Sequence, residues 1–313
     1  MTKQPGFARS ASVVTGAWQR LSGTAKGSIC LATAGAAFVV IAAIVHWMSA
    51  DIPLFQIAFL QQAVVVAMIG PGLAAGGWSR MRTARPWMHA GRSTATAAGI
   101  LFGFLAVTHL PVAEVTSILF SRMAFTSVLA VLLLGEVVRR ETWASVGLAS
   151  LGVVLVLSPD PGRMNWYGLA AVAAALGMSL TMLLTRYLRG ESRDAVVGWQ
   201  AIGLMVAFAA PAAFVWTPMQ PAHWLGCAAI GVLLWLSQHL NVFAYRYGEA
   251  NAIQPAEASR LLVAIGIDVA IFGVVPRLST FLGAGVIVLA IGTAVGLLDR
   301  LLRGRRRDAE AGD

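Results

Sequence analysis

Ten apolar segments, each about as long as a bilayer is thick, recur along this chain of 313 residues. A helix needs roughly 20 mostly apolar residues to cross the hydrocarbon core of a membrane. Backbone groups in lipid must be hydrogen-bonded within the protein, so the segments predict an all-α bundle, and they are too evenly apolar for barrel strands. We expect spans at 28–48, 55–77, 94–110, 112–134, 142–158, 166–188, 195–216, 223–244, 252–275 and 279–301.

The composition also places this chain in a membrane. Hydrophobic residues make up 58% of it and charged residues only 12%, which is more apolar surface than one soluble core can bury. The lipid bilayer is therefore an expected partner. The net charge of +9 would also suit a nucleic acid, but nothing else indicates such a surface, and we expect none. Cys30 and Cys227 lie in apolar segments and are expected to be packing residues.

The positions of the basic residues predict the orientation, because Lys and Arg are retained on the cytoplasmic side. With the N-terminus inside, most of the 23 basic residues fall in cytoplasmic segments, and only Arg163 and Arg277 fall in exterior links. An error of one span would invert every later segment. We therefore expect both termini in the cytoplasm, in a bacterial inner (plasma) membrane. The cytoplasmic link before the third span is expected to hold Arg80, Arg82, Arg85 and Arg92.

An internal repeat divides the chain into two halves. A shift of 138 residues superposes Ser121 and Arg122 on Ser259 and Arg260, and Gly147 on Gly285. Each half then holds five spans, and an odd number makes the second half enter the membrane from the opposite side. The prediction is two inverted five-helix repeats. The expected units are a cytoplasmic tail (1–27), the first repeat (28–158), the second repeat (166–301) and a basic cytoplasmic tail (302–313).

Short motifs in both halves resemble the EamA-like transporters of the drug/metabolite transporter superfamily. The motifs are LPVAE at 110–114, LAVLLLGE at 129–136, ASRL at 258–261, FG at 272–273 and GAG at 283–285. The resemblance implies ten spans in two repeats and secondary transport of a small metabolite, often by export. Two positions depart from the family, because Met123 stands where many relatives have proline and Val274 where they have glutamate.

Charged residues within the predicted spans are the candidates for substrate binding, because an ionisable group in the bilayer is costly. Arg260 and Asp268 are eight positions apart in the ninth span and so lie near one helix face, which Gln254 and Glu257 extend. Arg122, the repeat mate of Arg260, is expected at a similar central depth. A guanidinium binds carboxylate or phosphate through paired hydrogen bonds, so the arginines indicate an anionic or zwitterionic substrate.

The same charges have an alternative interpretation as internal ion pairs that brace the bundle. Arg260 would then pair with Glu257 or Asp268, and Arg122 with Glu114 or a neighbouring span. Asp268 and Glu257 are also candidates for coupling transport to protons, with a counter-substrate as the other option.

A further polar cluster in the eighth span, together with Gln200 in the seventh, is a candidate for the remaining wall of a polar cavity. Such residues also serve as interhelical hydrogen-bond partners. The cluster consists of Gln238, His239 and Asn241.

The sequence therefore favours a secondary transporter working by alternating access, with export as the expected direction. A membrane enzyme acting on a lipid-linked substrate would need Arg122, Asp268 and His239 to converge, and a channel is the third alternative. There is no phosphate-binding loop with its lysine, no two-histidine metal motif and no readable catalytic constellation. We expect no enzyme activity, no cofactor and no metal, and the oligomeric state stays open.

Overall fold

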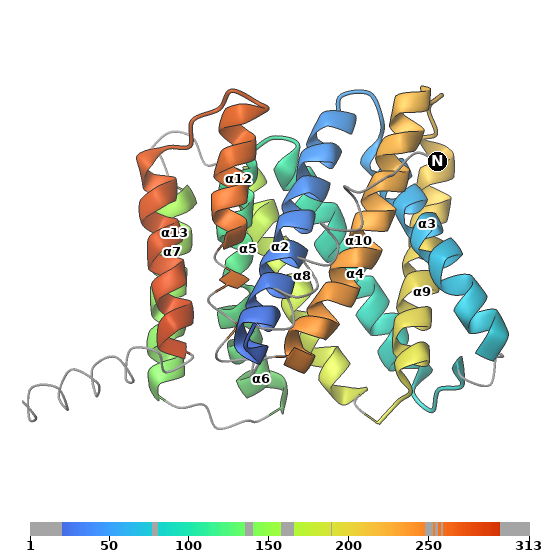
Figure 1. Cartoon of the computed structure of the whole chain (residues 1–313), viewed down its shortest axis with the longest axis horizontal. Coiled ribbons are helices and arrows are strands. Elements are labelled where there is room, and N and C mark those ends of the chain that lie inside the picture. The colour runs from blue at the N-terminus through green and yellow to red at the C-terminus, as the bar shows by residue number, and fades with distance from the viewer. Residues whose placement is uncertain are drawn as a thin grey trace, which may run out of the picture.

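The computed structural model describes residues 21–76, 81–134, 140–157, 166–188, 190–247, 253, 256–257 and 259–294. Within these ranges the long regular elements are all α-helices (Figure 1). In chain order they are α2 (Gly23–Met48), α3 (Leu54–Gly76), α4 (Pro86–Val107), α5 (Val112–Phe120), α6 (Arg122–Leu134), α7 (Arg140–Leu157), α8 (Trp166–Tyr187), α9 (Arg193–Phe214), α10 (Pro221–Tyr247), α12 (Ser259–Ala270) and α13 (Leu278–Ala294).

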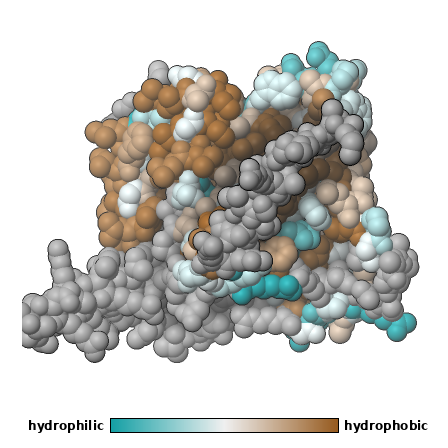
Figure 2. All heavy atoms as spheres, in the orientation of Figure 1, coloured by the Kyte–Doolittle hydropathy of each residue, from teal (hydrophilic) through white to brown (hydrophobic). Residues whose placement is uncertain are grey.

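Seven candidate spans in the described residues are long and apolar enough to cross a membrane. One of them, Val112–Leu133, runs through both α5 and α6. Their outer surfaces carry large apolar side chains, such as Leu225 and Leu262, each 72% exposed. Figure 2 shows apolar atoms over much of the side wall, with hydrophilic atoms toward its upper right and lower edges. Such a wall is suited to lipid rather than water.

The helices begin where the sequence supplies caps. Ser22 and Ser192 precede α2 and α9, and each side chain accepts a hydrogen bond from a backbone N–H three residues on. Proline opens α4 and α10, at the position where its missing N–H leaves no intrahelical bond unmade. These caps place the helix starts slightly outside the apolar segments.

Most of the helices pack against one another in pairs. Helix α7 packs on α13, α4 on α8, α2 on α10 and α3 on α9, while α12 lies between α2 and α5. In Figure 1, α7 and α13 form one side of the bundle, and α3 and α9 form the other. The main buried cluster draws on helices from both halves, including Val45, Ile118 and Ile230. The two halves of the sequence therefore share one core.

Three predicted boundaries need correction. The third span was expected at 94–110, but α4 begins at Pro86, so Arg92 lies inside a helix and is only 7% exposed. The fourth, expected as one helix over 112–134, is interrupted at Ser121, whose hydroxyl donates to the Ile118 carbonyl. The ninth, expected at 252–275, includes the shorter α12, which gives way to a turn and then irregular backbone with Gly273 at φ 65°.

Candidate substrate-binding site

A central cavity of about 440 Å³ lies between the two halves of the bundle. Its lining comes from α2, α3, α4, α5, α6, α8, α9, α10 and α12, together with Glu257. Apolar side chains such as Phe38 and Phe104 cover much of the wall. The polar lining residues are Gln61, Thr96, Thr116, Arg122, Gln200, Gln238, Asn241, Glu257 and Arg260.

Arg260 is a buried charge in the wall of this cavity. The buried residues of α12 are Arg260, Ala264 and Asp268, one per helical turn, so this face of the helix points into the bundle. The Arg260 guanidinium carbon lies 5.3 Å from the Phe38 ring centre and 5.9 Å from that of Phe120. Its Nε is buried without a hydrogen-bond partner, and the described side chains give Arg260 no ion pair. An unsatisfied buried donor of this kind indicates a missing acceptor.

The position of Arg260 depends on a close approach to α2. A Cβ added at Gly35 would stand 2.3 Å from Cγ of Arg260 and 2.8 Å from its Cδ. Glycine therefore leaves the space in which the aliphatic part of the arginine lies. Sequence analysis did not single out Gly35, because nothing in the sequence says which helix faces Arg260.

Arg122 and Glu257 form an ion pair across the two halves of the chain. One terminal nitrogen of Arg122 donates to both carboxylate oxygens of Glu257, each at 3.2 Å. The expected alternative of Arg122 pairing with Glu114 is not what the structure has, since Glu114 accepts from the Thr280 hydroxyl at 3.4 Å. Because Glu257 neutralises one arginine, the charged lining of the cavity keeps one positive charge in excess, on Arg260.

The part of the cavity wall formed by Thr96 and Gln200 is held by Arg92, a residue that sequence analysis assigned to a cytoplasmic link. Arg92 donates to the Thr185 hydroxyl, the Val196 carbonyl and the Gln200 side-chain oxygen. Arginine only donates, so it fixes the direction of the Gln200 amide, whose nitrogen donates to Thr96 Oγ1 at 3.1 Å. Gln200 and Thr96 line the cavity while Arg92 stands behind them.

Asp268 lies apart from the other charged candidates, although it shares a helix with Arg260. Its two oxygens accept hydrogen bonds from the backbone N–H groups of Val112 and Ala113, at 2.9 and 2.7 Å. It is 1% exposed and is absent from the residues that line the cavity. The expected ion pair between Asp268 and Arg260 is therefore replaced by a carboxylate bound to the start of α5.

The polar cluster of the eighth span is divided by the structure. Gln238 and Asn241 line the cavity, and the Asn241 amide nitrogen donates to the Ser237 carbonyl at 2.9 Å. His239 is exposed, does not line the cavity, and contacts Trp235 of its own helix through both its ring and the Trp235 carbonyl. Gln254 lies outside the described residues.

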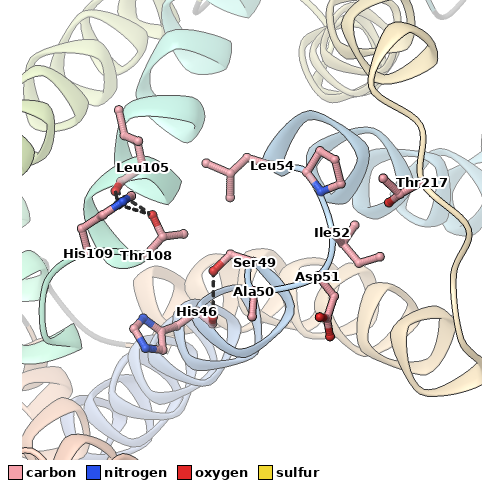
Figure 3. Close-up of a pocket in the computed structure, with 11 residues that line it drawn as sticks. His46, Ser49, Ala50, Asp51, Ile52, Leu54, Leu105, Thr108, His109 and Thr217 are labelled. Carbon is pink, nitrogen blue, oxygen red and sulfur yellow. Dashed lines mark hydrogen bonds between the residues drawn. The ribbon is translucent and has the colours of Figure 1, made fainter.

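A second hollow, of about 570 Å³, opens at the surface where α2 and α4 end (Figure 3). The link from α2 to α3 forms one side of it, with Ser49 and Asp51, and the end of α4 forms another, with Leu105 and His109. It shares no lining residue with the central cavity. His46 lies at its border, where Nδ1 binds the Val107 carbonyl and the ring meets Phe272.

The first half of the sequence matches a known protein family. Residues 25–158 match the model of the EamA-like transporter family. This part of the chain is therefore similar to the EamA-like transporters. The EamA-like segment contributes α2 to α7, and hence Gly35, Arg92 and Arg122 of the site just described. With the seven apolar candidate spans, its presence makes the chain an integral membrane protein.

Curated relatives extend the similarity to known transporters over both halves of the chain. A riboflavin transporter of Rhizobium johnstonii is 26% identical, over 84% of this chain and 89% of its own length. A riboflavin transporter of Vibrio cholerae is 25% identical, over 85% and 91%. An S-adenosylmethionine uptake transporter of Rickettsia conorii is 25% identical, over 75% and 80%. These proteins are transporters by name, and none of the three is named as an enzyme.

A solved crystal structure shares the fold of this chain. It superposes with a TM-score of 0.61 at 19% sequence identity, over 88% of this chain and 99% of the other. The arrangement of helices around the cavity is thus that of a known fold.

Proposed function

We propose that this protein is a secondary transporter that carries a small organic metabolite through the central cavity and binds a negatively charged group of it with Arg260. The observation that carries the proposal is the buried Arg260 guanidinium, whose Nε has no acceptor although it lines a cavity. A carboxylate or phosphate would supply that acceptor and neutralise the excess charge. A zwitterionic substrate would meet the same need.

The relatives indicate the size and chemistry of substrates to try. Riboflavin and S-adenosylmethionine, which the relatives are named for, both combine a flat heteroaromatic ring with a polar tail. The cavity offers an apolar wall with Phe38 and Phe104 beside its polar residues. A substrate that joins a ring to an anionic or zwitterionic tail would use both kinds of surface.

Two inverted repeats are supported by the way the helices pack. The shift of 138 residues pairs α2 with α8, α3 with α9, α4 with α10 and α7 with α13. If each helix is replaced by its mate in the other half, the contact of α2 with α10 corresponds to the contact of α8 with α4. The contact of α3 with α10 corresponds in the same way to that of α9 with α4. All four contacts are present. Such pseudo-symmetry is the architecture in which related bundles rock about a central site to give alternating access.

Transport by this protein is proposed to draw on an ion or counter-substrate gradient. The sequence has no ATP-binding loop. Protons are a candidate through Asp268 or Glu257, since both are buried carboxylates. The Asp268→Asn protein should then lose uphill accumulation while it retains exchange, and full accumulation by that variant would exclude Asp268 as the proton carrier.

Direction and membrane also belong to the proposal. We place the protein in a bacterial inner membrane with both termini in the cytoplasm. The resemblance to exporters favours export, whereas the Rickettsia relatives are named for uptake. Net flux measured from either side of right-side-out vesicles distinguishes the two.

The test is counterflow into proteoliposomes containing the purified protein, with radiolabelled riboflavin and S-adenosylmethionine as first probes. Comparing metabolites inside and outside cells, with and without the protein, extends the search to other compounds. Arg260→Lys should impair transport and Arg260→Gln should impair it more, because lysine keeps the charge but loses the paired hydrogen bonds. Well-folded Arg260→Gln protein that transports normally would exclude Arg260 from the substrate site.

Two controls accompany this test. The first distinguishes substrate binding by Arg260 from a structural ion pair, and the second distinguishes a carrier from a channel or an enzyme. If Arg260 only balances Glu257, its variants should lose folded yield, and a variant in which Arg122, Glu257 and Arg260 are all replaced by Gln should recover function, because Arg122 also pairs with Glu257. Saturable flux of a chemically unchanged compound distinguishes a carrier from a channel and from an enzyme acting on a lipid-linked substrate.

A further inference from the structure

We propose that Asp268 is a latch that keeps one end of the central cavity closed by capping α5, and that losing this cap opens the cavity to that side. The end in question, here named the α5 end, is where α2 and α4 finish and α5 begins. The inference rests on the proposed function only in treating the cavity as a transport path.

The cap joins two helices that are far apart in sequence. Val112 and Ala113 are the first two residues of α5, and N–H groups in a first helical turn have no partner within their own helix. Pro111, in the cap position, makes no side-chain bond to them. Asp268 of α12 binds both N–H groups instead, and a carboxylate is also favoured there by the helix dipole.

The cap lies beside the layer that separates the central cavity from the surface hollow. Val112 lines the cavity, and Ala113 next to it is fully buried. His46 ties α2 to the Val107 carbonyl of α4, and its ring lies with its centre 4.6 Å from that of Phe272, just beyond α12. The ends of α2, α4, α5 and α12 are thus held together at this level. A solute leaving the cavity toward the hollow must part them.

The corresponding place in the first half has no equivalent group. The shift of 138 residues that relates the halves sets Ala130 against Asp268, and an alanine side chain accepts no hydrogen bond. Position 130 therefore cannot supply the charge-assisted cap that Asp268 gives to α5. We infer that it biases the resting protein toward the form in which this end is closed.

The experiment measures access to the cavity and needs no substrate. A reporter cysteine replaces Ala42, which lines the cavity on α2, in protein with Cys30→Ser and Cys227→Ala. A membrane-impermeant maleimide is applied to right-side-out and to inside-out vesicles. Two variants weaken the cap, one on each side of the hydrogen bonds. Asp268→Asn keeps the shape of the side chain but places an amide N–H against one of the two backbone donors. Val112→Pro removes the Val112 N–H donor, at a helix position that accepts proline.

The matched control is Glu114→Gln. It removes a carboxylate in the same first turn of α5, and among the described residues this carboxylate accepts a long hydrogen bond from the Thr280 hydroxyl. Folded yield is checked for every variant by size-exclusion chromatography.

Both latch variants should label Ala42→Cys from the α5 side about tenfold faster than the parent, the scale expected for losing one charge-assisted hydrogen bond. Glu114→Gln should label at the parental rate. The latch is rejected if neither latch variant labels faster than the parent, or if the parent already labels from the α5 side as fast as the latch variants. It is also rejected if Glu114→Gln labels as fast as they do. An increase confined to inside-out vesicles would support the latch and reverse the proposed orientation. Failure of counterflow with every probe would leave these labelling rates unaffected, so the two proposals fail separately.

Discussion

At the scale of single residues, the burial of charge separates structural roles from binding roles. Asp268 is buried but receives two backbone hydrogen bonds, and Arg122 is paired with Glu257. Arg260 lies against two phenyl rings, and its Nε has no acceptor. A buried donor without an acceptor is costly, so Arg260 is the residue for which we propose an acceptor on a ligand.

The space at Gly35 gives a prediction about this arginine. Gly35→Ala should displace the Arg260 side chain, since the new Cβ would overlap Cγ and Cδ. Overpacking of this kind costs about 1–3 kcal/mol, so we expect a lower melting temperature and reduced counterflow. Gly266→Ala, on α12 with open space at its Cβ, is the control and should behave as wild type. Normal transport by Gly35→Ala would mean that the position of Arg260 is not critical.

Glu191 gives a prediction about pH. The Thr83 hydroxyl, at 2.6 Å, chiefly lowers the pKa of Glu191, helped by bonds from His89 and Ala84. A carboxyl with a lowered folded-state pKa stabilises the fold above its unfolded pKa of about 4.3, and this stability is lost as the pH falls through the folded value. Glu191→Gln should therefore melt at a lower temperature than the parent at pH 7, with a difference that shrinks toward pH 3. A difference independent of pH would contradict the assignment.

At the scale of helices, the sequence predicted positions better than it predicted breaks. Most apolar segments became helices within a few residues of their expected bounds. The interruption at Ser121 depends on a side-chain hydrogen bond to Ile118, which the apolar pattern does not record. Of the charged residues at the cavity, the pattern predicted Arg122, Glu257 and Arg260 within the membrane but not Arg92, because an arginine at the edge of an apolar segment is read as part of a link. Its partners come from α8 and α9, and only the fold brings them together.

Arg92 supports a prediction about the contact of α4 with α8 and α9. Arg92→Lys should lower the melting temperature, because one ammonium group cannot replace donors fixed toward three acceptors, and each buried acceptor left unpaired costs about 1–3 kcal/mol. The amide of Gln200 would also be free to turn, which should raise the concentration of substrate needed for half-maximal flux. Arg85→Lys is the control, since Arg85 is exposed and its side chain donates to the Tyr187 carbonyl. Equal effects of both changes would argue against a special role for Arg92.

At the scale of the whole molecule, charge and helix packing bear on the same question of orientation. Within the described residues, exposed Arg82 and Arg85 lie in the link between α3 and α4, which the Glu191 hydrogen bonds join to the link between α8 and α9. The hollow of Figure 3 lies among the opposite links, at the α5 end. From the positive-inside rule we therefore expect the Glu191 links in the cytoplasm and the hollow on the exterior.

The last prediction tests this assignment directly. Single cysteines at Gly190, in the link from α8 to α9, and at Pro218, in the link from α9 to α10, should react differently in protein that lacks Cys30 and Cys227. Both sites are exposed, and a Cβ at Gly190 meets no atom within 4 Å, so access depends on the side of the membrane rather than on burial. An impermeant thiol reagent added to intact cells should label Pro218→Cys, whereas Gly190→Cys should label only after the membrane is opened. Because α9 alone separates the two sites, the reverse result would invert the orientation of the whole bundle and place the Asp268 cap on the cytoplasmic side.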